Sequence, residues 1–313
     1  MTAGWRTGLL RLTSGILTAV TCVTVLAGAS SAQTPAPASE KDEALRRAVS
    51  RRLEATAEAV DGVVAYHIVD VATGQVFSRD ADAPFPTASA IKIGILYELF
   101  RQADEGRIDL DAPREVAPSE RVGGSGVLQH LHNPAVSPRD HAMLMILLSD
   151  NTSTNVLIDL VGIESVNRRM ASLGATTFAL ERRMMDADAV AAGRENLSSA
   201  ADLVRVMDAI RRGDGLTTQS RDAALEILRR PGPTSIRAGI PSSVPVAAKP
   251  GGLDGVRTEV AFVDLPGRPY LIAVMTTFLA DEREGATAMV EMSRTAYGYF
   301  DRLARAGREG RLR

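Results

Sequence analysis

Ser89 and Lys92 are the first residues in this chain whose types and spacing indicate chemistry. They interrupt residues 85–96, a segment of mostly small and apolar side chains that is typical of a core-facing helix. Residues at this spacing lie on one face of a helix, so the hydroxyl and the amine are expected to be neighbours. A half-buried ammonium is costly unless it is paired or neutral, and a serine hydroxyl needs a nearby base to become a nucleophile. The pair therefore predicts an activated serine.

Lysine is scarce in this chain, which makes each lysine more informative. The sequence holds 36 Lys and Arg residues together, yet lysine occurs only at Lys41, Lys92 and Lys249. A codon bias towards arginine is the simplest cause. Because arginine stays protonated in proteins whereas lysine can lose its proton, Lys92 and Lys249 are the lysines that need a chemical explanation.

Two further polar segments follow the first. Ser149, Asp150 and Asn151 divide an apolar helix pattern, which by itself favours a helix end and restart with Ser149 or Asp150 as the N-cap. Lys249 stands at the end of a β-like stretch and is followed by Pro250 and glycines, a pattern that also fits a surface turn with a solvated lysine. Each segment alone is a weak signal.

Hydrophobic periodicity predicts the elements that must position these residues. Strands are expected at 63–71, 75–78 and 244–249, and two more within 256–278, joined at 264–268. Helices are expected at 43–60, 87–105, 138–148, 151–160, 165–172, 199–211, 222–229 and 283–303. Because a two-stranded hairpin alone is marginally stable, the early and late strands should share one sheet. The expected fold class is α/β (α+β): an antiparallel sheet from both ends of the chain, flanked by helices, with a central all-helical lobe and a cleft between them.

The N-terminal segment differs from the rest of the chain. Arg6 and Arg11 precede an apolar run from Ile16 to Ala27, and small residues follow, as in a secretory signal. Cleavage after Ala29 or Ala32 fits equally well. An uncleaved membrane anchor is the alternative, but the run is short for a bilayer span. We expect a signal peptide over 1–32, a linker over 33–42, one enzyme domain over 43–305 and a basic tail over 306–313.

Composition excludes several classes of function. The chain has 313 residues, a net charge of −2 and a pI near 6.1, which gives no footprint for nucleic acid. Its one cysteine, Cys22, lies in the expected signal, so the exported chain should have no thiol, disulfide or cysteine-bound metal. His130 and His132 could touch a metal, but histidines in a Gly-rich loop are more often simply exposed. We therefore expect no metal or cofactor, and a periplasmic or secreted monomer without a membrane span.

Together, the three polar segments form a specific set. The patterns S-x-x-K, S-D-N and K-x-G occur in this order in class A β-lactamases and penicillin-binding proteins. The chain resembles that family from about Glu43 to the last helix, through PFPTASAIKIGIL, LLSDNTSTNVLIDLVG and KPGGLDGVR. The resemblance implies a β-lactamase/transpeptidase-like fold and a serine hydrolase.

The resemblance also implies a role for each motif residue. Ser89 is the nucleophile that becomes acylated, and Lys92 takes its proton or polarises its hydroxyl. Ser149 relays a proton to the leaving nitrogen, and Asn151 binds the acylamide side chain of the substrate. Lys249 holds the Ser149 hydroxyl and attracts the substrate carboxylate.

Two further residues complete the expected substrate site. The resemblance places the oxyanion hole at the backbone N–H groups of Ser89 and Gly252. Arg257, which follows Lys249 on the next expected strand, is a second anchor for a carboxylate because a guanidinium suits bidentate binding.

The sequence departs from the family pattern at two places. Pro250 replaces the Thr or Ser of the lysine-containing motif and lacks both a hydroxyl and an N–H. In the loop that carries the water-activating glutamate of the lactamases, our alignment places Met184 at the glutamate and Asp188 at the following asparagine. Glu181, Asp186 and Asp188 are candidate substitutes, and Asp186 and Asp188 lie on the expected loop.

These observations favour an exported hydrolase that opens β-lactam amide bonds through an acyl-enzyme on Ser89. A D-alanyl-D-alanine peptidase of cell-wall peptides is the first alternative. The second is a penicillin-binding or sensing domain that becomes acylated and stays so. In each case the expected partner is a small molecule or a short peptide.

Overall fold

The computed structural model describes Met1 and residues 40–230, 232, 234–307 and 310–312. The expected signal peptide beyond Met1, and residues 33–39 of the expected linker, lie outside this range. Helix α1 (Glu40–Glu58) begins inside the expected linker, because acidic residues at Glu40, Asp42 and Glu43 favour the positive end of a helix dipole.

A five-stranded antiparallel sheet forms the centre of the domain, in the order β2-β1-β9-β8-β7. Its strands are β1 (Val63–Asp70), β2 (Val76–Arg79), β7 (Val246–Leu253), β8 (Val256–Val263) and β9 (Tyr270–Thr277). Strand β1, from the start of the domain, pairs with β9, near its end. The predicted fold class, with early and late strands in one sheet, is therefore confirmed. Seven of the eight residues of β9 are buried, because helices cover both faces of the sheet.

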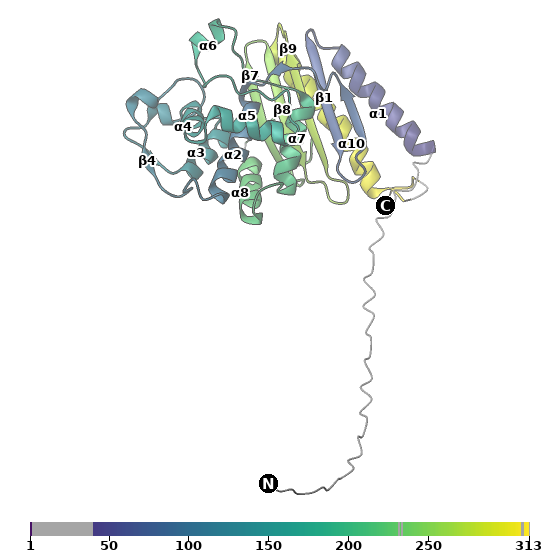
Figure 1. Cartoon of the computed structure of the whole chain (residues 1–313). Helices are drawn as coiled ribbons and strands as arrows, with labels where there is room; N and C mark the ends of the chain where they lie inside the picture. Colours follow the sequence, from purple (N-terminus) through teal and green to yellow (C-terminus); the bar gives the residue numbers. More distant parts are fainter. Residues whose placement is uncertain (2–39, 231, 233, 308–309, 313) are drawn as a thin grey trace. The chain divides into compact units, whose positions relative to one another are not determined.

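The two faces of the sheet carry different helices (Figure 1). On one face α1 packs with the last helix, α10 (Glu282–Arg305), around buried residues such as Leu53, Ile68 and Met292. On the other face α7 (Ala200–Arg212) packs against β1, β8 and β9. The central helical lobe continues outward from α7. Its other helices are α2 (Lys92–Asp104), α3 (Pro138–Leu147), α4 (Asn151–Val161), α5 (Ile163–Ser172) and α8 (Thr218–Arg229).

Several short elements complete the domain. They are the strand pairs β3 (Phe85–Pro86) with β6 (Leu197–Ser198) and β4 (Arg114–Glu115) with β5 (Ala135–Val136), the helices α6 (Ala187–Ala191) and α9 (Ser235–Ala238), and the 3-10 turns η1 (Ala88–Ile91), η2 (Pro118–Glu120) and η3 (Leu128–His130). The sequence predicted none of these elements separately. Most are too short to show a hydrophobic period, and η1 was predicted as the first turn of a single helix over 87–105.

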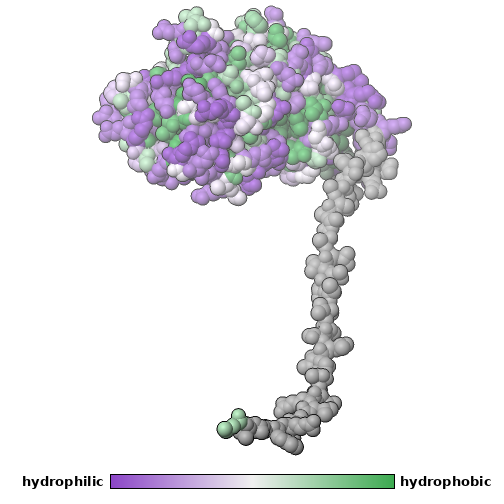
Figure 2. Space-filling view, viewed as in Figure 1, coloured by the Kyte–Doolittle hydropathy of each residue, from purple (hydrophilic) through white to green (hydrophobic). Residues whose placement is uncertain are grey.

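The surface of the domain is mixed. Hydrophilic residues dominate the face shown in Figure 2, with apolar residues in smaller areas between them. None of the helices in the described ranges is both long enough and apolar enough to cross a bilayer.

Candidate active site

The segment that carries Ser89 is a strained 3-10 turn rather than the start of a regular helix. Ala88, just before Ser89, has φ +46°, a conformation that L-residues rarely adopt. The backbone oxygen of Thr87 accepts hydrogen bonds from Ala90 N at 3.0 Å and from Thr258 Oγ1, on β8, at 2.7 Å. Such strain is common at functional sites, where the surrounding contacts hold it in place. Here the sheet fixes the position of Ser89.

Lys92 lies one 3-10 turn after Ser89, as the first residue of α2, and is fully buried. Its amine donates hydrogen bonds to Ser149 O at 2.8 Å, Ser149 Oγ at 3.0 Å and Asn151 Oδ1 at 3.2 Å. Burial holds the pKa of Lys92 well below its usual value; the charge of Lys249 adds to this effect and Asp150 opposes it. This lowered pKa favours the neutral amine, which is the form that can accept a proton.

Ser149 and Asp150 lie between α3 and α4, where the sequence allowed either a helix restart or a catalytic motif. The helix restart is present, with Asp150 as the N-cap of α4. Asp150 caps α4 through Ser153 N at 2.8 Å, and its other oxygen accepts the N–H groups of Val127 and Leu128 at 2.6 and 2.9 Å. Ser149 has φ +53°. Asp150 thus turns the chain so that Ser149 faces Lys92, and it also fixes the Gly-rich loop at 123–128.

Lys249 is a buried strand residue, so the alternative of a solvated lysine in a surface turn was wrong. It is 1% exposed, and its amine donates to Ser149 Oγ at 3.3 Å and to Pro250 O at 2.8 Å. Burial lowers the pKa of Lys249 to about 7, and the nearby carboxylate of Glu259 opposes this shift. The Ser149 hydroxyl therefore lies between two buried amines, those of Lys92 and Lys249.

Strand β7 continues through the glycines after Lys249 and passes close to the Ser89 turn. A Cβ atom built on Gly251 would lie 2.7 Å from Thr87 O and 2.8 Å from Ser89 N, so only glycine permits this approach. Pro250 is tolerated because β7 is the edge strand of the sheet. Gly252 follows on the same strand and lines a cavity together with Ser89.

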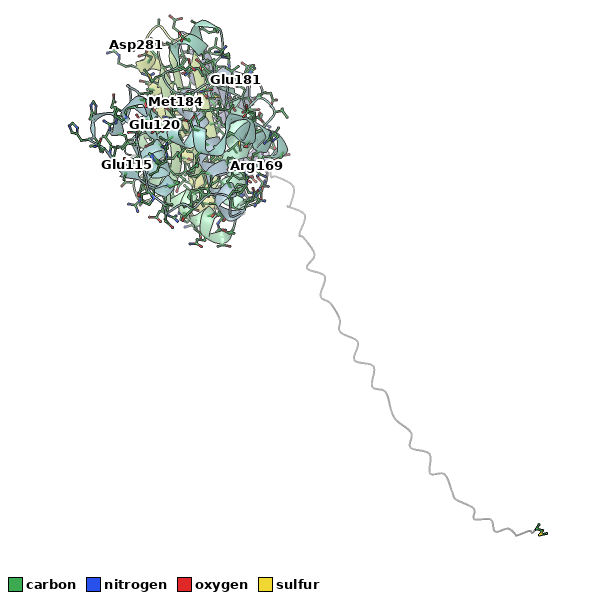
Figure 3. All side chains as sticks on the ribbon, turned by 60° about the vertical axis from the view of Figure 1, so that its left-hand side comes forward. Glu115, Glu120, Arg169, Glu181, Met184 and Asp281 are labelled. Atoms are coloured by element: carbon green, nitrogen blue, oxygen red, sulfur yellow. The ribbon has the colours of Figure 1, made fainter. Side chains whose placement is uncertain are left out.

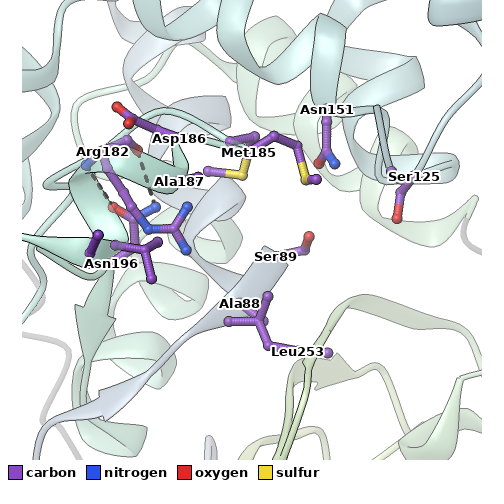
Figure 4. A pocket seen from close by; sticks show the side chains of 15 residues that line it. Ala88, Ser89, Ser125, Asn151, Arg182, Met185, Asp186, Ala187, Asn196 and Leu253 are labelled. Atoms are coloured by element: carbon purple, nitrogen blue, oxygen red, sulfur yellow. Dashed lines mark hydrogen bonds between the residues drawn. The ribbon is translucent and has the colours of Figure 1, made fainter. Parts of the chain in front are cut away.

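Two adjoining cavities open at Ser89. One, of about 550 Å³, is lined by residues that include Asn151, Met184, Met185 and Leu253. Figure 4 shows Ser89 between the loop that carries Met185 and the strand end at Leu253. The second cavity, of about 420 Å³, is lined by Ser89, Ser125, Ser149, Lys249, Pro250, Gly251, Gly252, Leu253, Asp254, Arg257 and Glu282. All three motifs therefore meet at one cleft between the lobe and the sheet.

The comparisons with known proteins agree with this geometry. Residues 47–300 match the model of the beta-lactamase enzyme family. The chain belongs to that family. A β-lactamase of Rhodobacter capsulatus is 27% identical over 82% of this chain and 85% of its own length, and one of Streptomyces fradiae is 27% identical over 85% and 89%. The predicted resemblance to class A β-lactamases is confirmed, and the chain is an enzyme of the β-lactamase type.

Solved structures also resemble the domain. A β-lactamase from Sphaerobacter thermophilus is 32% identical, with a TM-score of 0.73, over 80% of this chain and 95% of that one. PBP-A is 28% identical, with a TM-score of 0.74, over 81% and 96%. An ancestral class A β-lactamase, at 24% identity and a TM-score of 0.75, shares the fold.

Three asparagines of this β-lactamase family member hold the loop that carries Met184. Asn155, in α4, accepts from Met184 N at 2.7 Å and donates to Met184 O at 3.1 Å. Asn167 makes the same pair of bonds to Leu180, and Asn196 accepts from Arg182 N at 3.1 Å and donates to Arg182 O at 3.2 Å. The Asn155 side chain therefore holds both the backbone N–H and the backbone C=O of Met184 in place.

The side chains of this loop differ in their access to the cleft. Met184, labelled in Figure 3, is 8% exposed. It lines the larger cavity. Asp186 lines it as well, but it caps α6 by accepting from Ala189 N at 2.9 Å. Asp188 is exposed and Glu181 is exposed, and neither lines that cavity. Of the three candidate substitutes for the water-activating glutamate, only Asp186 reaches the cleft.

Sequence reasoning missed several residues of the site. They are Ser125, Asn155, Asn196, Glu259 and Glu282. Asn155 could have been found, because it lies one helical turn after Asn151 and so shares its face. The others come from distant segments and carry no local signal.

The position of Pro250 in the cavity predicts how this residue affects the rate of acylation. Replacing Pro250 with Thr returns a hydroxyl to a strand that lines the cavity beside Lys249. A hydrogen bond to a charged group is worth about 1.5–3 kcal/mol at best, so we expect acylation by penicillins to improve by at most roughly tenfold to a hundredfold. Time-resolved intact mass spectrometry measures the rate. No gain in a folded variant would mean that another group already fills this role.

Proposed function

We propose that this enzyme opens β-lactam amide bonds through an acyl-enzyme on Ser89, and that the ester is hydrolysed slowly. The observation that carries the proposal is the buried Lys92 amine, one turn from Ser89 and hydrogen-bonded to Ser149. A desolvated lysine with a depressed pKa is a suitable base for a serine nucleophile.

The proposed acylation step uses the groups described above. Ser89 Oγ attacks the lactam carbonyl carbon while its proton passes to the neutral Lys92 amine. The N–H groups of Ser89 and Gly252 stabilise the oxyanion of the tetrahedral intermediate. When the C–N bond breaks, Ser149 gives its proton to the leaving nitrogen and regains one from Lys92. Lys249 holds the Ser149 hydroxyl in place from the other side.

Substrate binding follows from the two cavities. Lys249, in its protonated form, attracts the substrate carboxylate in the smaller cavity, with Arg257 as the second proposed anchor. Asn151 lines the larger cavity, where the acylamide side chain would lie. Its Nδ2 group donates to Gly123 O at 3.1 Å, which leaves one N–H of the amide for the substrate.

A related protein supports the acylation half of this mechanism. A PBP-A variant in which a leucine is replaced with glutamate has been solved as an acyl-enzyme complex with penicillin G; it is 27% identical, with a TM-score of 0.74. Met184 in our loop alignment favours slow hydrolysis of such an ester, because a thioether cannot act as a base. The same observation favours a second function, a penicillin-binding domain or cell-wall peptidase for which lactams are slow substrates.

The Ser89→Ala variant tests the nucleophile. We expect it to form no covalent adduct with penicillin, whereas the wild-type enzyme gains the mass of one penicillin molecule. Ser125→Ala is the matched control, because Ser125 lines both cavities but lies in no lysine motif. An adduct of undiminished yield on Ser89→Ala would assign acylation to another residue.

We also propose that the chain acts outside the cytoplasm as a monomer. The basic, apolar and small-residue order of positions 1–32 supports export. Comparison of the intact mass of the exported protein with that of the full chain would identify the cleavage site.

A further inference from the structure

The guanidinium of Arg257 is already engaged within the protein. Its Nη1 group donates to Leu253 O at 3.1 Å and to Val256 O at 2.8 Å, the residues on either side of the turn between β7 and β8. Its Nη2 group donates to Glu282 Oε2 at 3.3 Å. Arg257 therefore faces the cleft as one half of an ion pair, rather than as a free cation.

Glu282 is held in a defined position between two partners. It lies in the first turn of α10, and its Oε1 atom accepts from Gly255 N at 3.2 Å. Its side chain is 37% exposed, and that of Arg257 is 31% exposed. Both residues line the cavity that contains Ser89 and Lys249. The carboxylate thus occupies the place at which a substrate carboxylate would meet Arg257.

We propose that Glu282 is a specificity-determining residue that competes with the substrate carboxylate for Arg257. This inference rests on the proposed function. A carboxylate that approaches Arg257 must displace Glu282 or lie beside its negative charge, and Asp254 adds a further acidic group to the same cavity. The main cation left for a carboxylate-bearing substrate is Lys249. The enzyme should therefore discriminate only weakly between a β-lactam carboxylate and its neutral ester.

The test compares penicillin G with penicillin G methyl ester on the wild-type enzyme and on Glu282→Gln. Glutamine keeps the size of the side chain and its acceptor for Gly255 N, so the turn stays held. The pair is partly exposed and its effect is therefore modest. We expect the efficiency of acylation by penicillin G to rise about threefold to tenfold in the variant, with that of the ester unchanged.

Two further variants separate this effect from a general change of charge. Glu284→Gln removes the same charge from the same turn of α10, but Glu284 accepts from Asp61 N and does not line the cavity. We expect it to behave as wild type with both substrates. In an Arg257→Gln background, Glu282→Gln should change the ratio of the two efficiencies less than it does with Arg257 present, because the competition for Arg257 is gone and only the charge of Glu282 remains.

The outcomes distinguish this inference from the proposed function. Equal changes for the acid and the ester, or an unchanged ratio in Glu282→Gln, would overturn the role of Glu282 while leaving acylation at Ser89 intact. Failure of both substrates to acylate wild-type Ser89 would overturn the proposed function, and the inference with it.

Discussion

The Lys92→Arg variant should lose most of its acylation by penicillin, although it keeps a cation at the same place. Arginine stays protonated in proteins, so it cannot take the proton of Ser89. It is also bulkier than lysine, in a site where Lys92 is 0% exposed. If proton transfer contributes the usual ~10²- to 10⁴-fold, the rate constant for acylation should fall by about that factor.

Two control variants separate the loss of the proton acceptor from the effects of added bulk and of misfolding. Lys41→Arg makes the same substitution on the exposed surface of α1 and should acylate as wild type. Lys92→Met removes the amine without adding bulk and should show a loss similar to Lys92→Arg; thermal unfolding confirms that each variant is folded. Acylation at the wild-type rate in either Lys92 variant would leave Lys92 with only a structural role.

The pH dependence of acylation is an independent test of whether the neutral Lys92 amine is the proton acceptor. Burial lowers its pKa, so the neutral, proton-accepting form persists to a lower pH than for an exposed lysine. Acylation should therefore fall as the pH is lowered through this depressed pKa, because Lys92 becomes protonated.

Wild-type enzyme mixed with penicillin should open one lactam ring per site in a rapid burst, keep the opened product bound as the acyl-enzyme, and then turn over slowly. Met184→Glu should raise the steady rate by roughly 10²-fold or more, because a positioned base is worth ~10²- to 10⁴-fold. Asn155 holds both backbone polar groups of Met184, so the new carboxylate starts from a fixed position in a residue that lines the larger cavity. Stopped-flow absorbance gives the burst, and intact mass gives the fraction of acyl-enzyme.

A neighbouring substitution is the matched control for this prediction. Met185→Glu adds the same charge to the same loop, but Met185 is 58% exposed and has φ +63°. Misplacement by about 1 Å can cost ~10²-fold, so we expect no comparable gain. Asp186→Asn should slow turnover only if Asp186 is the substitute base. Steady turnover without a burst, with free enzyme dominant, would show that the loop already activates water and that our alignment is wrong.

The sequence by itself determined the order of the elements and the identity of the motifs. Period-2 and period-3.6 patterns are local, so strands such as β8 and helices such as α10 could be predicted to within a few residues. The motifs were recognisable because S-x-x-K and S-D-N each lie within a few consecutive residues. Pro250 and Met184 were visible as departures for the same reason.

Only the tertiary structure decided how the motifs work together. Ser149 Oγ receives hydrogen bonds from Lys92 and from Lys249, which are far from it and from each other along the chain. The pKa of each lysine depends on burial by elements that no local pattern connects to it. The pairing of Arg257 with Glu282 likewise depends on how α10 meets the turn between β7 and β8. Such contacts depend on how distant segments pack together. A local sequence pattern predicts secondary structure and short motifs, but it does not predict which distant residues come into contact.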